Sequence, residues 1–194
     1  MLFPNLQGWK IVLGSGSPRR RELVADLDLP VEVRVREIEE VWPDSVAGVE
    51  VAEWLAREKA AAQTHLLLPH ELLITGDTVV VLGDRLLEKP ADATEAFEML
   101  RALSGRTHTV ASGLAVTTVD GGTWSCLDEA QVTFADLPDL ALHHYIERYK
   151  PFDKAGAYGI QEWIGAVGVS RIEGSFYTIM GLPVHRLFEH LRGL

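Results

Sequence analysis

The sequence is short of cysteine and of long apolar runs, and each shortage excludes a class of protein. Cys126 is the only cysteine among the 194 residues, so no internal disulfide can form and a reducing compartment is indicated. No stretch approaches the roughly 20 consecutive apolar residues that a membrane span requires. Residues 1–10 also lack the basic start and the apolar run of a signal peptide. We therefore expect a cytoplasmic protein with no membrane partner.

Positive charge is scarce as well. The chain has 18 lysine and arginine residues against 28 aspartate and glutamate residues, which gives a formal net charge of -10. Nucleic acids and anionic membranes bind basic faces, so we expect no nucleic-acid partner. A polyanionic ligand would need basic groups gathered in one place, or the help of a metal ion.

Several common motifs are also missing. The chain has no Walker A ending, no Gly-x-Gly-x-x-Gly fingerprint, and neither His-Glu-x-x-His nor Cys-x-x-Cys. These absences exclude the usual nucleotide loops and disfavour zinc. Repeats and linkers are missing too, so the length and apolar content fit a single globular domain over residues 1–194.

Near its N-terminus the sequence contains a strand-to-helix turn that suits an anion. The stretch LGSGSPRRR (residues 13–21) follows a short apolar strand and precedes a helical pattern. Ser17 is placed as the N-cap and Pro18 as the first helical residue. The glycines leave backbone N–H groups accessible, Ser15 adds a hydroxyl, and the helix start and three arginines supply positive charge. The pattern is typical of a phosphate site, although the same residues also begin ordinary helices.

Two acidic features are candidates for metal binding or catalysis. A strand over 31–36 runs into Glu-Ile-Glu-Glu at 37–40, which is either a solvated strand end or a site for a hard cation such as Mg²⁺. The apolar run 72–82 is interrupted by Gly76-Asp77-Thr78 and then resumes. Asp77 is either a turn residue or, where strands end over a cleft, a general base or metal ligand.

The rest of the pattern mixes helices and strands, which predicts an α/β fold. A helix over 49–68 carries Lys59, which is an ordinary exposed lysine unless it lies near the anion site. The small residues of 153–161 either allow close packing or form a loop over a planar base, with Gln161 facing the edge of the base. Further elements are predicted as helices at 92–103, 137–149 and 183–193, and as strands at 106–119, 124–134 and 167–172, with turns at 83–84 and 120–122.

Collected together, these stretches resemble the Maf family of nucleoside triphosphate pyrophosphatases over nearly the whole chain. Each motif alone is weak, but five or six in register are hard to obtain by chance. In chain order the matching motifs are Ser15-Gly16-Ser17-Pro18-Arg19-Arg20, Gly76-Asp77-Thr78-Val79-Val80, Glu88-Lys89-Pro90, Ser104-Gly105-Arg106-Thr107-His108, residues 153–161 and Gly181-Leu182-Pro183.

The resemblance implies hydrolysis of a nucleoside triphosphate between its α and β phosphates, with Mg²⁺ or Mn²⁺ as cofactor. Carried over by position, Asp77 is the proton acceptor for the attacking water and lies at the metal together with Glu40. Arg19, Thr78 and Gln161 are expected to set the choice of base. The residues expected to bind the phosphates are Ser15, Ser17, Arg20, Lys59, Lys89 and Lys154.

The resemblance also implies a fold and a substrate class. We expect a Maf/ITPase-like fold, an elongated and strongly twisted mixed sheet flanked by helices, with two lobes around a central cleft, in a homodimer. Asp77-Thr78 resembles members that act on dTTP and UTP, with modified pyrimidines tolerated. Relatives that prefer methylated GTP have glutamine after the aspartate. Two alternatives stay open, namely the same chemistry on methylated GTP and a nucleotide-binding regulator of septum formation.

Overall fold

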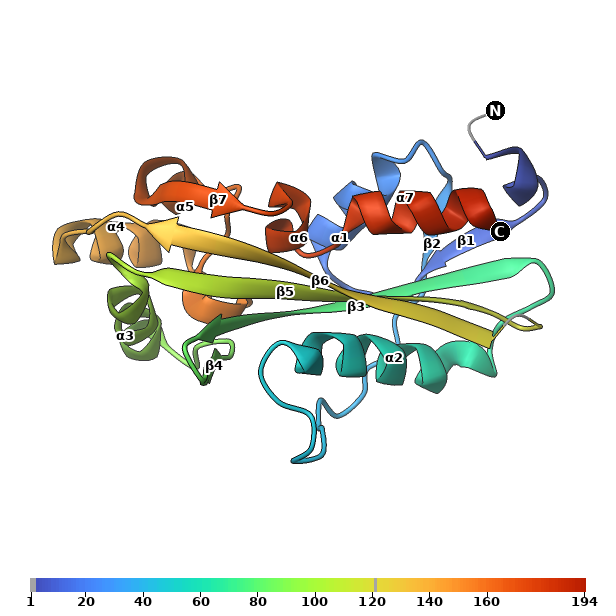
Figure 1. Cartoon of the computed structure of the whole chain (residues 1–194), viewed down its shortest axis with the longest axis horizontal. Coiled ribbons are helices and arrows are strands. Elements are labelled where there is room, and N and C mark those ends of the chain that lie inside the picture. The colour runs from blue at the N-terminus through green and yellow to red at the C-terminus, as the bar shows by residue number, and fades with distance from the viewer. Residues whose placement is uncertain (1–2, 121) are drawn as a thin grey trace.

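One mixed β-sheet runs the length of the molecule (Figure 1). The computed structural model describes residues 3–120 and 122–194. Within them, seven strands form a sheet in the order β2-β1-β3-β5-β6-β7, with β4 paired to β3 outside this path. The strands are β1 Lys10–Leu13, β2 Val31–Val33, β3 Glu71–Leu82, β4 Arg85–Leu87, β5 Thr107–Thr118, β6 Gly122–Phe134 and β7 Val169–Glu173.

The sheet is parallel at one end and antiparallel over the rest. β1 lies parallel to both β2 and β3, whereas β3, β5, β6 and β7 pair antiparallel in turn. Figure 1 shows β3, β5 and β6 as long, twisted ribbons that connect the two ends of the molecule. These observations confirm the predicted elongated mixed sheet of an α/β fold.

Helices pack against both faces of this sheet. α2 covers one face, α1 and α7 cover the opposite face at the same end, and α3 and α4 gather at the other end (Figure 1). No helix in the described part of the chain combines the length and apolar character needed to cross a membrane. The helices are α1 Pro18–Ala25, α2 Glu50–Thr64, α3 Ala93–Leu103, α4 Asp139–Tyr149, α5 Trp163–Gly168, α6 Phe176–Met180 and α7 Val184–Gly193, with short 3₁₀ turns at Pro4–Leu6 and Ala155–Ala157.

β3 determines which side chains face which layer. Ile74 packs among residues of α1 and α7, whereas Val79 packs beneath α2. Side chains alternate along a strand, so Asp77 shares the α2 face with Val79 and Thr78 shares the opposite face with Ile74. Asp77 and Thr78 are consecutive in β3 and therefore project from opposite faces of the sheet.

One prediction about β3 is wrong. The run does not break at Gly76-Asp77-Thr78, because these residues pair with residues 112–114 of β5 within a continuous strand. Asp77 therefore lies in the middle of β3 rather than in a turn or at the end of that strand. On the other edge, β1 ends opposite Ile74 and the pairing with β4 begins at Val80, so the polar triplet lies between the two. The apolar pattern continues because β5 satisfies the backbone across the triplet.

The other predicted elements are confirmed with corrected boundaries, and the helix expected over 49–68 ends at Thr64. Asp92 caps α3, since its carboxylate accepts hydrogen bonds from the backbone N–H groups of Thr94 and Glu95 at 2.8 and 2.9 Å. β2 ends at Val33 rather than at residue 36. The strand expected from residue 167 begins at Val169, because the preceding residues form α5. The predicted turn at 120–122 contains residue 121, which lies outside the described residues.

Gly113 allows α2 to approach β5 closely, and it stands directly opposite Asp77 in the sheet. A Cβ atom at this position would lie 2.1 Å from the backbone oxygen of Ala52 in α2. We predict that Gly113→Ala lowers the free energy of unfolding by about 3 kcal/mol, because the backbone of α2 must move away. Urea denaturation measures the effect, with Gly193→Ala as the control, since a Cβ there meets nothing within 4 Å. Equal stability of the two variants would contradict the prediction.

Arg34 and Glu71 fix the course of the chain that follows β2. Arg34 donates two hydrogen bonds of 2.9 Å to the buried Glu71 carboxylate, which lowers the pKa of Glu71 to about 2. A lowered pKa in the folded state stabilises the protein above about pH 4.5 and loses this effect as the pH falls toward 2. We predict that the gap in unfolding free energy between wild type and Glu71→Gln shrinks over this range. A gap that stays constant in urea titrations from pH 6 to pH 2.5 would contradict this.

Candidate functional site

A cavity of about 630 Å³ gathers all eleven residues that were predicted to form the site. It opens beside the polar triplet of β3, between the start of α1 and the loop at residues 153–161. The eleven predicted site residues that line it are Ser15, Ser17, Arg19, Arg20, Glu40, Lys59, Asp77, Thr78, Lys89, Lys154 and Gln161. Segments separated by more than a hundred residues therefore meet in one place.

The start of α1 has the predicted cap. The hydroxyl of Ser17 accepts a hydrogen bond from the backbone N–H of Arg20 at 3.4 Å, and Pro18 is the first helical residue. The hydroxyl of Ser15 in turn accepts from the backbone N–H of Ser17 at 3.3 Å. The two serines thus shape the turn at the positively charged end of the helix dipole, where it borders the cavity.

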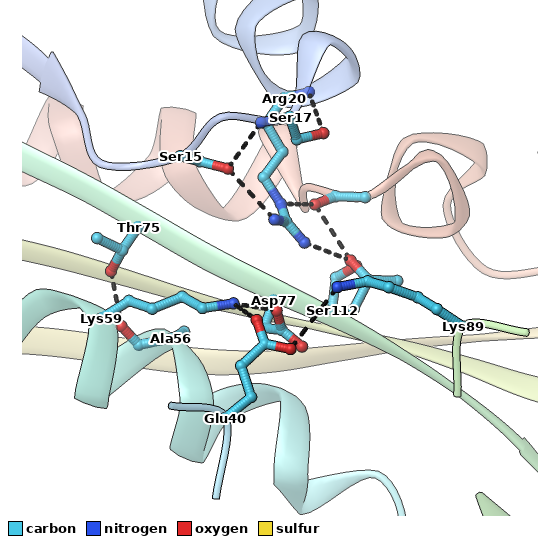
Figure 2. Close-up of polar contacts among 12 residues, drawn as sticks. Ser15, Ser17, Arg20, Glu40, Ala56, Lys59, Thr75, Asp77, Lys89 and Ser112 are labelled. Carbon is cyan, nitrogen blue, oxygen red and sulfur yellow. Dashed lines mark hydrogen bonds and ion pairs between the residues drawn. The ribbon is translucent and has the colours of Figure 1, made fainter. Parts of the chain in front are cut away.

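Arg20 projects from this helix start into the site and is surrounded by neutral partners (Figure 2). Its guanidinium donates to the backbone oxygen of Gly181 at 2.9 Å, to the hydroxyl of Thr78 at 3.1 Å and to the hydroxyl of Ser15 at 3.4 Å. Burial lowers the pKa of Arg20 from its ordinary value, which still leaves the group charged at neutral pH. No described residue forms an ion pair with Arg20, so its positive charge is available to an anionic ligand.

A chain of hydroxyl groups continues from Arg20 into the protein. The hydroxyl of Thr78 lies 2.8 Å from that of Ser112, which donates to the backbone oxygen of Thr178 at 2.7 Å. The hydroxyl of Thr178 donates to the carboxylate of Asp128 at 2.5 Å. β3, β5, α6 and β6 are thereby linked behind the site, and none of these inner residues stood out in the sequence.

On the other wall, one lysine bridges two carboxylates (Figure 2). The ammonium of Lys59 lies 2.5 Å from Oδ1 of Asp77 and 2.6 Å from Oε1 of Glu40. Lys89 approaches the second oxygen of Glu40 at 3.6 Å. The hydroxyl of Thr75 in β3 donates to the backbone oxygen of Ala56 at 2.7 Å, which fastens α2 to the sheet one turn before Lys59.

These contacts decide the charge state of Glu40. Burial favours the neutral carboxyl, but the hydrogen bond from Lys59 and the charges of Lys59 and Lys89 outweigh it, so the pKa of Glu40 lies below its ordinary value. Within the acidic cluster at 37–40, Glu40 lines the cavity, whereas Glu37 and Glu39 do not.

A second set of charges lies on the loop at 153–161. The guanidinium of Arg19 pairs with Asp153 at 3.2 Å, and the ammonium of Lys154 pairs with Asp153 at 2.7 Å and with Glu162 at 3.2 Å. Burial opposes ionisation of Asp153, but the hydrogen bond and charge of Lys154 and the charge of Arg19 lower its pKa overall. Arg19 therefore connects α1 to a loop that is distant in the sequence.

The same loop supplies the uncharged part of the cavity. Gln161 is exposed and borders it, and the buried Tyr158 faces it alongside Ile179 and Met180 of α6. The hydroxyl of Tyr158 lies 2.7 Å from Nε2 of His108, deeper in the core. Apolar side chains next to an exposed amide suit a planar ring with polar edges.

Sequence reasoning missed part of this network. Asp153 was visible as half of a charged pair at the head of its loop, but nothing marked it as the partner of Arg19. Glu162 and Ser112 gave no signal, because a lone carboxylate at a helix start and a hydroxyl inside a strand are common in any fold.

Metal binding requires a donor set, and the described residues contain no group of three or more His, Cys, Asp or Glu side chains that could hold an ion alone. Asp77 and Glu40 nevertheless share one cation, the ammonium of Lys59, between their oxygens. Mg²⁺ is commonly bound by one or two carboxylates together with substrate phosphates. The donor chemistry thus fits a hard divalent ion that arrives with an anionic ligand.

Comparison with known proteins places this geometry in context. A dTTP/UTP pyrophosphatase of Parabacteroides distasonis is 47% identical over 192 residues, which cover 98% of this chain and 99% of that protein. A dTTP/UTP pyrophosphatase of Flavobacterium psychrophilum is 46% identical over 191 residues, which cover 98% of this chain and 97% of that protein.

Two solved structures share the fold at low sequence identity. The Ham1 protein of Staphylococcus aureus has a TM-score of 0.53 and 16% identity, over 95% of this chain and 98% of that one. A HAM1 protein from Coxiella burnetii has a TM-score of 0.52 and 18% identity, over 96% of this chain and 100% of that one. Residues 10–194 match the family model described as Maf-like protein. Because that match spans nearly the whole chain and the relatives share almost half of its residues, this chain belongs to the Maf-like protein family.

Proposed function

We propose that this protein hydrolyses dTTP and UTP between the α and β phosphates and releases the nucleoside monophosphate and pyrophosphate. The names of its full-length relatives support the substrate class. The structural observation that carries the proposal is the meeting of Arg20, a cation with only neutral partners, and the Asp77 carboxylate in one cavity. Phosphoryl transfer needs this combination of charge neutralisation and a positioned base.

Asp77 is assigned as the general base. In the free protein, Lys59 holds Oδ1 of this carboxylate at 2.5 Å, in the middle of a paired strand. We assign Oδ2 as the atom that takes a proton from the attacking water while the new bond to the α phosphorus forms. The bond from that phosphorus to the bridging oxygen breaks, and the pyrophosphate leaves with the electron pair.

The phosphates are assigned to the basic wall of the cavity. Arg20 offers a planar fork of donors to phosphate oxygens, and the helix start behind Ser15 and Ser17 adds partial positive charge. Lys59, Lys89 and Lys154 complete the set, and in the free protein their charges are balanced by carboxylates. Binding of the polyphosphate would exchange some of these internal ion pairs for pairs with the ligand.

A divalent cation, Mg²⁺ or Mn²⁺, is proposed as the cofactor, with Asp77 and Glu40 as its protein ligands. When bound, such an ion neutralises phosphate charge and makes a coordinated water more acidic. Without the ion, the ammonium of Lys59 lies between the same two carboxylates. When the ion binds, Lys59 would move toward the phosphates, which its flexible side chain permits.

Base selection is assigned to Arg19, Thr78 and Gln161. They line the cavity from three different elements, α1, β3 and the loop at 153–161. The amide of Gln161 can both donate to and accept from the edge of a uracil or thymine ring. Location in the cytoplasm and assembly as a homodimer are further proposals, which cell fractionation and light scattering on the purified protein would test.

A panel of triphosphates tests the function. The protein is incubated with UTP, dTTP, CTP, GTP and methylated GTP in the presence of Mg²⁺ or Mn²⁺, and the products are separated by anion-exchange chromatography. We expect UMP or dTMP with stoichiometric pyrophosphate and the highest kcat/KM for UTP and dTTP. Orthophosphate as the sole inorganic product would identify a phosphatase instead, and a preference for methylated GTP would overturn the substrate assignment.

A further inference from the structure

Lys154 has a carboxylate partner that does not belong to the cavity. Its side chain is only 9% exposed and lines the cavity, while Glu162, 3.2 Å away, does not line it. The ammonium of Lys154 donates a hydrogen bond to Asp153 at 2.7 Å and forms an ion pair with Glu162. Glu162 therefore lies behind a cation that faces the site.

Glu162 is itself held from behind. One of its oxygens pairs with Lys154, and the other accepts a hydrogen bond from the hydroxyl of Tyr145 in α4. Tyr145 is fully buried, and this burial, together with its bond to Glu162, raises the pKa of Tyr145 above its ordinary value, so the hydroxyl keeps its proton. The same hydroxyl accepts from the backbone N–H of Gly159 at 3.0 Å. Tyr145 thus fastens both the carboxylate and the loop to α4.

Packing restricts the carboxylate further. A Cβ atom on Gly159 would lie 2.9 Å from the carboxyl carbon of Glu162, so the backbone of the loop is in close contact with it. Asp153, the other partner of Lys154, is 61% exposed and is shared with Arg19. An incoming phosphate competes with the Asp153 carboxylate for the ammonium of Lys154, because both are anions. Glu162 is the partner that keeps its position.

We propose that Glu162, held by Tyr145, is a positioning residue that directs the ammonium of Lys154 toward a phosphate group of the bound nucleotide. This inference rests on the proposed function, since it takes the phosphates of a nucleoside triphosphate as the ligand. Glu162 does not touch the substrate. Its contribution passes through Lys154, and removing its charge should therefore matter only while Lys154 is present.

A double-mutant cycle measures this dependence. The dissociation constant of α,β-methylene-UTP is determined by calorimetry with Mg²⁺ for wild type, Glu162→Gln, Lys154→Gln and the double variant. We expect Glu162→Gln to weaken binding about 10-fold, because the ammonium of Lys154 then loses the carboxylate that orients it. In the Lys154→Gln background the same change should have no further effect, because the two side chains act as a unit. Tyr145→Phe should weaken binding in the same direction and by a smaller factor.

Two control variants separate the loss of positioning of Lys154 from a general disturbance of the fold. Glu173→Gln removes a carboxylate from an exposed ion pair with Arg171 outside the cavity, and Tyr149→Phe removes a hydroxyl from the ring stacked on Tyr145. Both should bind like wild type. No loss of affinity in Glu162→Gln, or an equal loss with and without Lys154, would overturn the inference. If Glu162→Gln does not fold, the same cycle with Tyr145→Phe decides by the same criteria.

The hydrolysis assay on wild type keeps the two proposals apart. If wild type leaves UTP intact and the binding cycle shows the expected coupling, the proposed function is overturned and the role of Glu162 is retained. If wild type releases UMP and pyrophosphate but the cycle shows no coupling, the proposed function is retained and the role of Glu162 is overturned.

Discussion

Asp77→Asn should lower kcat on UTP by about 100- to 10,000-fold, the usual range for loss of a general base. The amide is nearly isosteric with the carboxylate and can still accept a hydrogen bond from Lys59, so the geometry of the strand is retained. It cannot take a proton from water, and it removes the charge of one of the two carboxylates that we propose as ligands of the divalent ion. Pyrophosphate release under saturating UTP and Mg²⁺ measures the effect.

Two comparisons make this result interpretable. Asp84→Asn changes an exposed aspartate in the tight turn after β3, outside the cavity, and should leave kcat unchanged. Binding of α,β-methylene-UTP without metal should change far less than kcat in Asp77→Asn, since the phosphate-binding groups remain. A variant with kcat near that of wild type would refute the assignment of Asp77. In cells, an Asp77→Asn protein that retained a division phenotype would favour the regulatory alternative.

Arg20→Ala should raise KM for UTP by at least about 100-fold, the largest effect that we expect on binding. Arg20 is the cation of the site whose hydrogen-bond partners are all neutral, so it has no ion pair to break before it contacts a phosphate. Its loss also leaves the backbone oxygen of Gly181 and two hydroxyls without their donor. Initial-rate kinetics and the thermal midpoint should both register the change.

Arg20→Lys discriminates charge from geometry at the same position. It keeps the positive charge but loses the fork that contacts three partners at once, and we expect KM to rise about 10-fold. Arg21→Ala is the matched control, because Arg21 is exposed on the next helical position and does not line the main cavity. Equal KM values for Arg20→Ala and Arg21→Ala would refute the role of Arg20.

Local features of the site could be predicted because they depend on neighbours in sequence. The cap at Ser17, Pro18 at the helix start and the cap of α3 at Asp92 are short-range hydrogen-bond patterns that the chain itself specifies. The apolar run of β3 likewise indicated a buried strand. Its polar triplet was mistaken for an interruption, because pairing with β5 is invisible in a local pattern.

The distances within the site could not be predicted, because they depend on how distant elements pack. Lys59 meets Asp77 because Gly113 lets the backbone of α2 lie against β5, and nothing near Lys59 encodes that. α5 was missed for a similar reason, since its glycines and valine have low helix propensity and its stability comes from burying Ile164. The role of Arg19 as a partner of Asp153 follows only from the fold.

The hydroxyl chain behind Arg20 has a fixed polarity, which follows from its inner end. A carbonyl oxygen can only accept, so the single hydrogen of Ser112 is committed to Thr178, and Ser112 must receive the hydrogen of Thr78. The alternative acceptor for Thr78, the backbone oxygen of Gly181 at 3.3 Å, also belongs to the protein. Thr78 therefore offers a bound ligand no hydrogen, only the lone pair that its hydrogen bond from Arg20 leaves free. A ring nitrogen that carries a hydrogen, as N3 of uracil and thymine does, can satisfy it, whereas the bare N3 of cytosine would meet another acceptor.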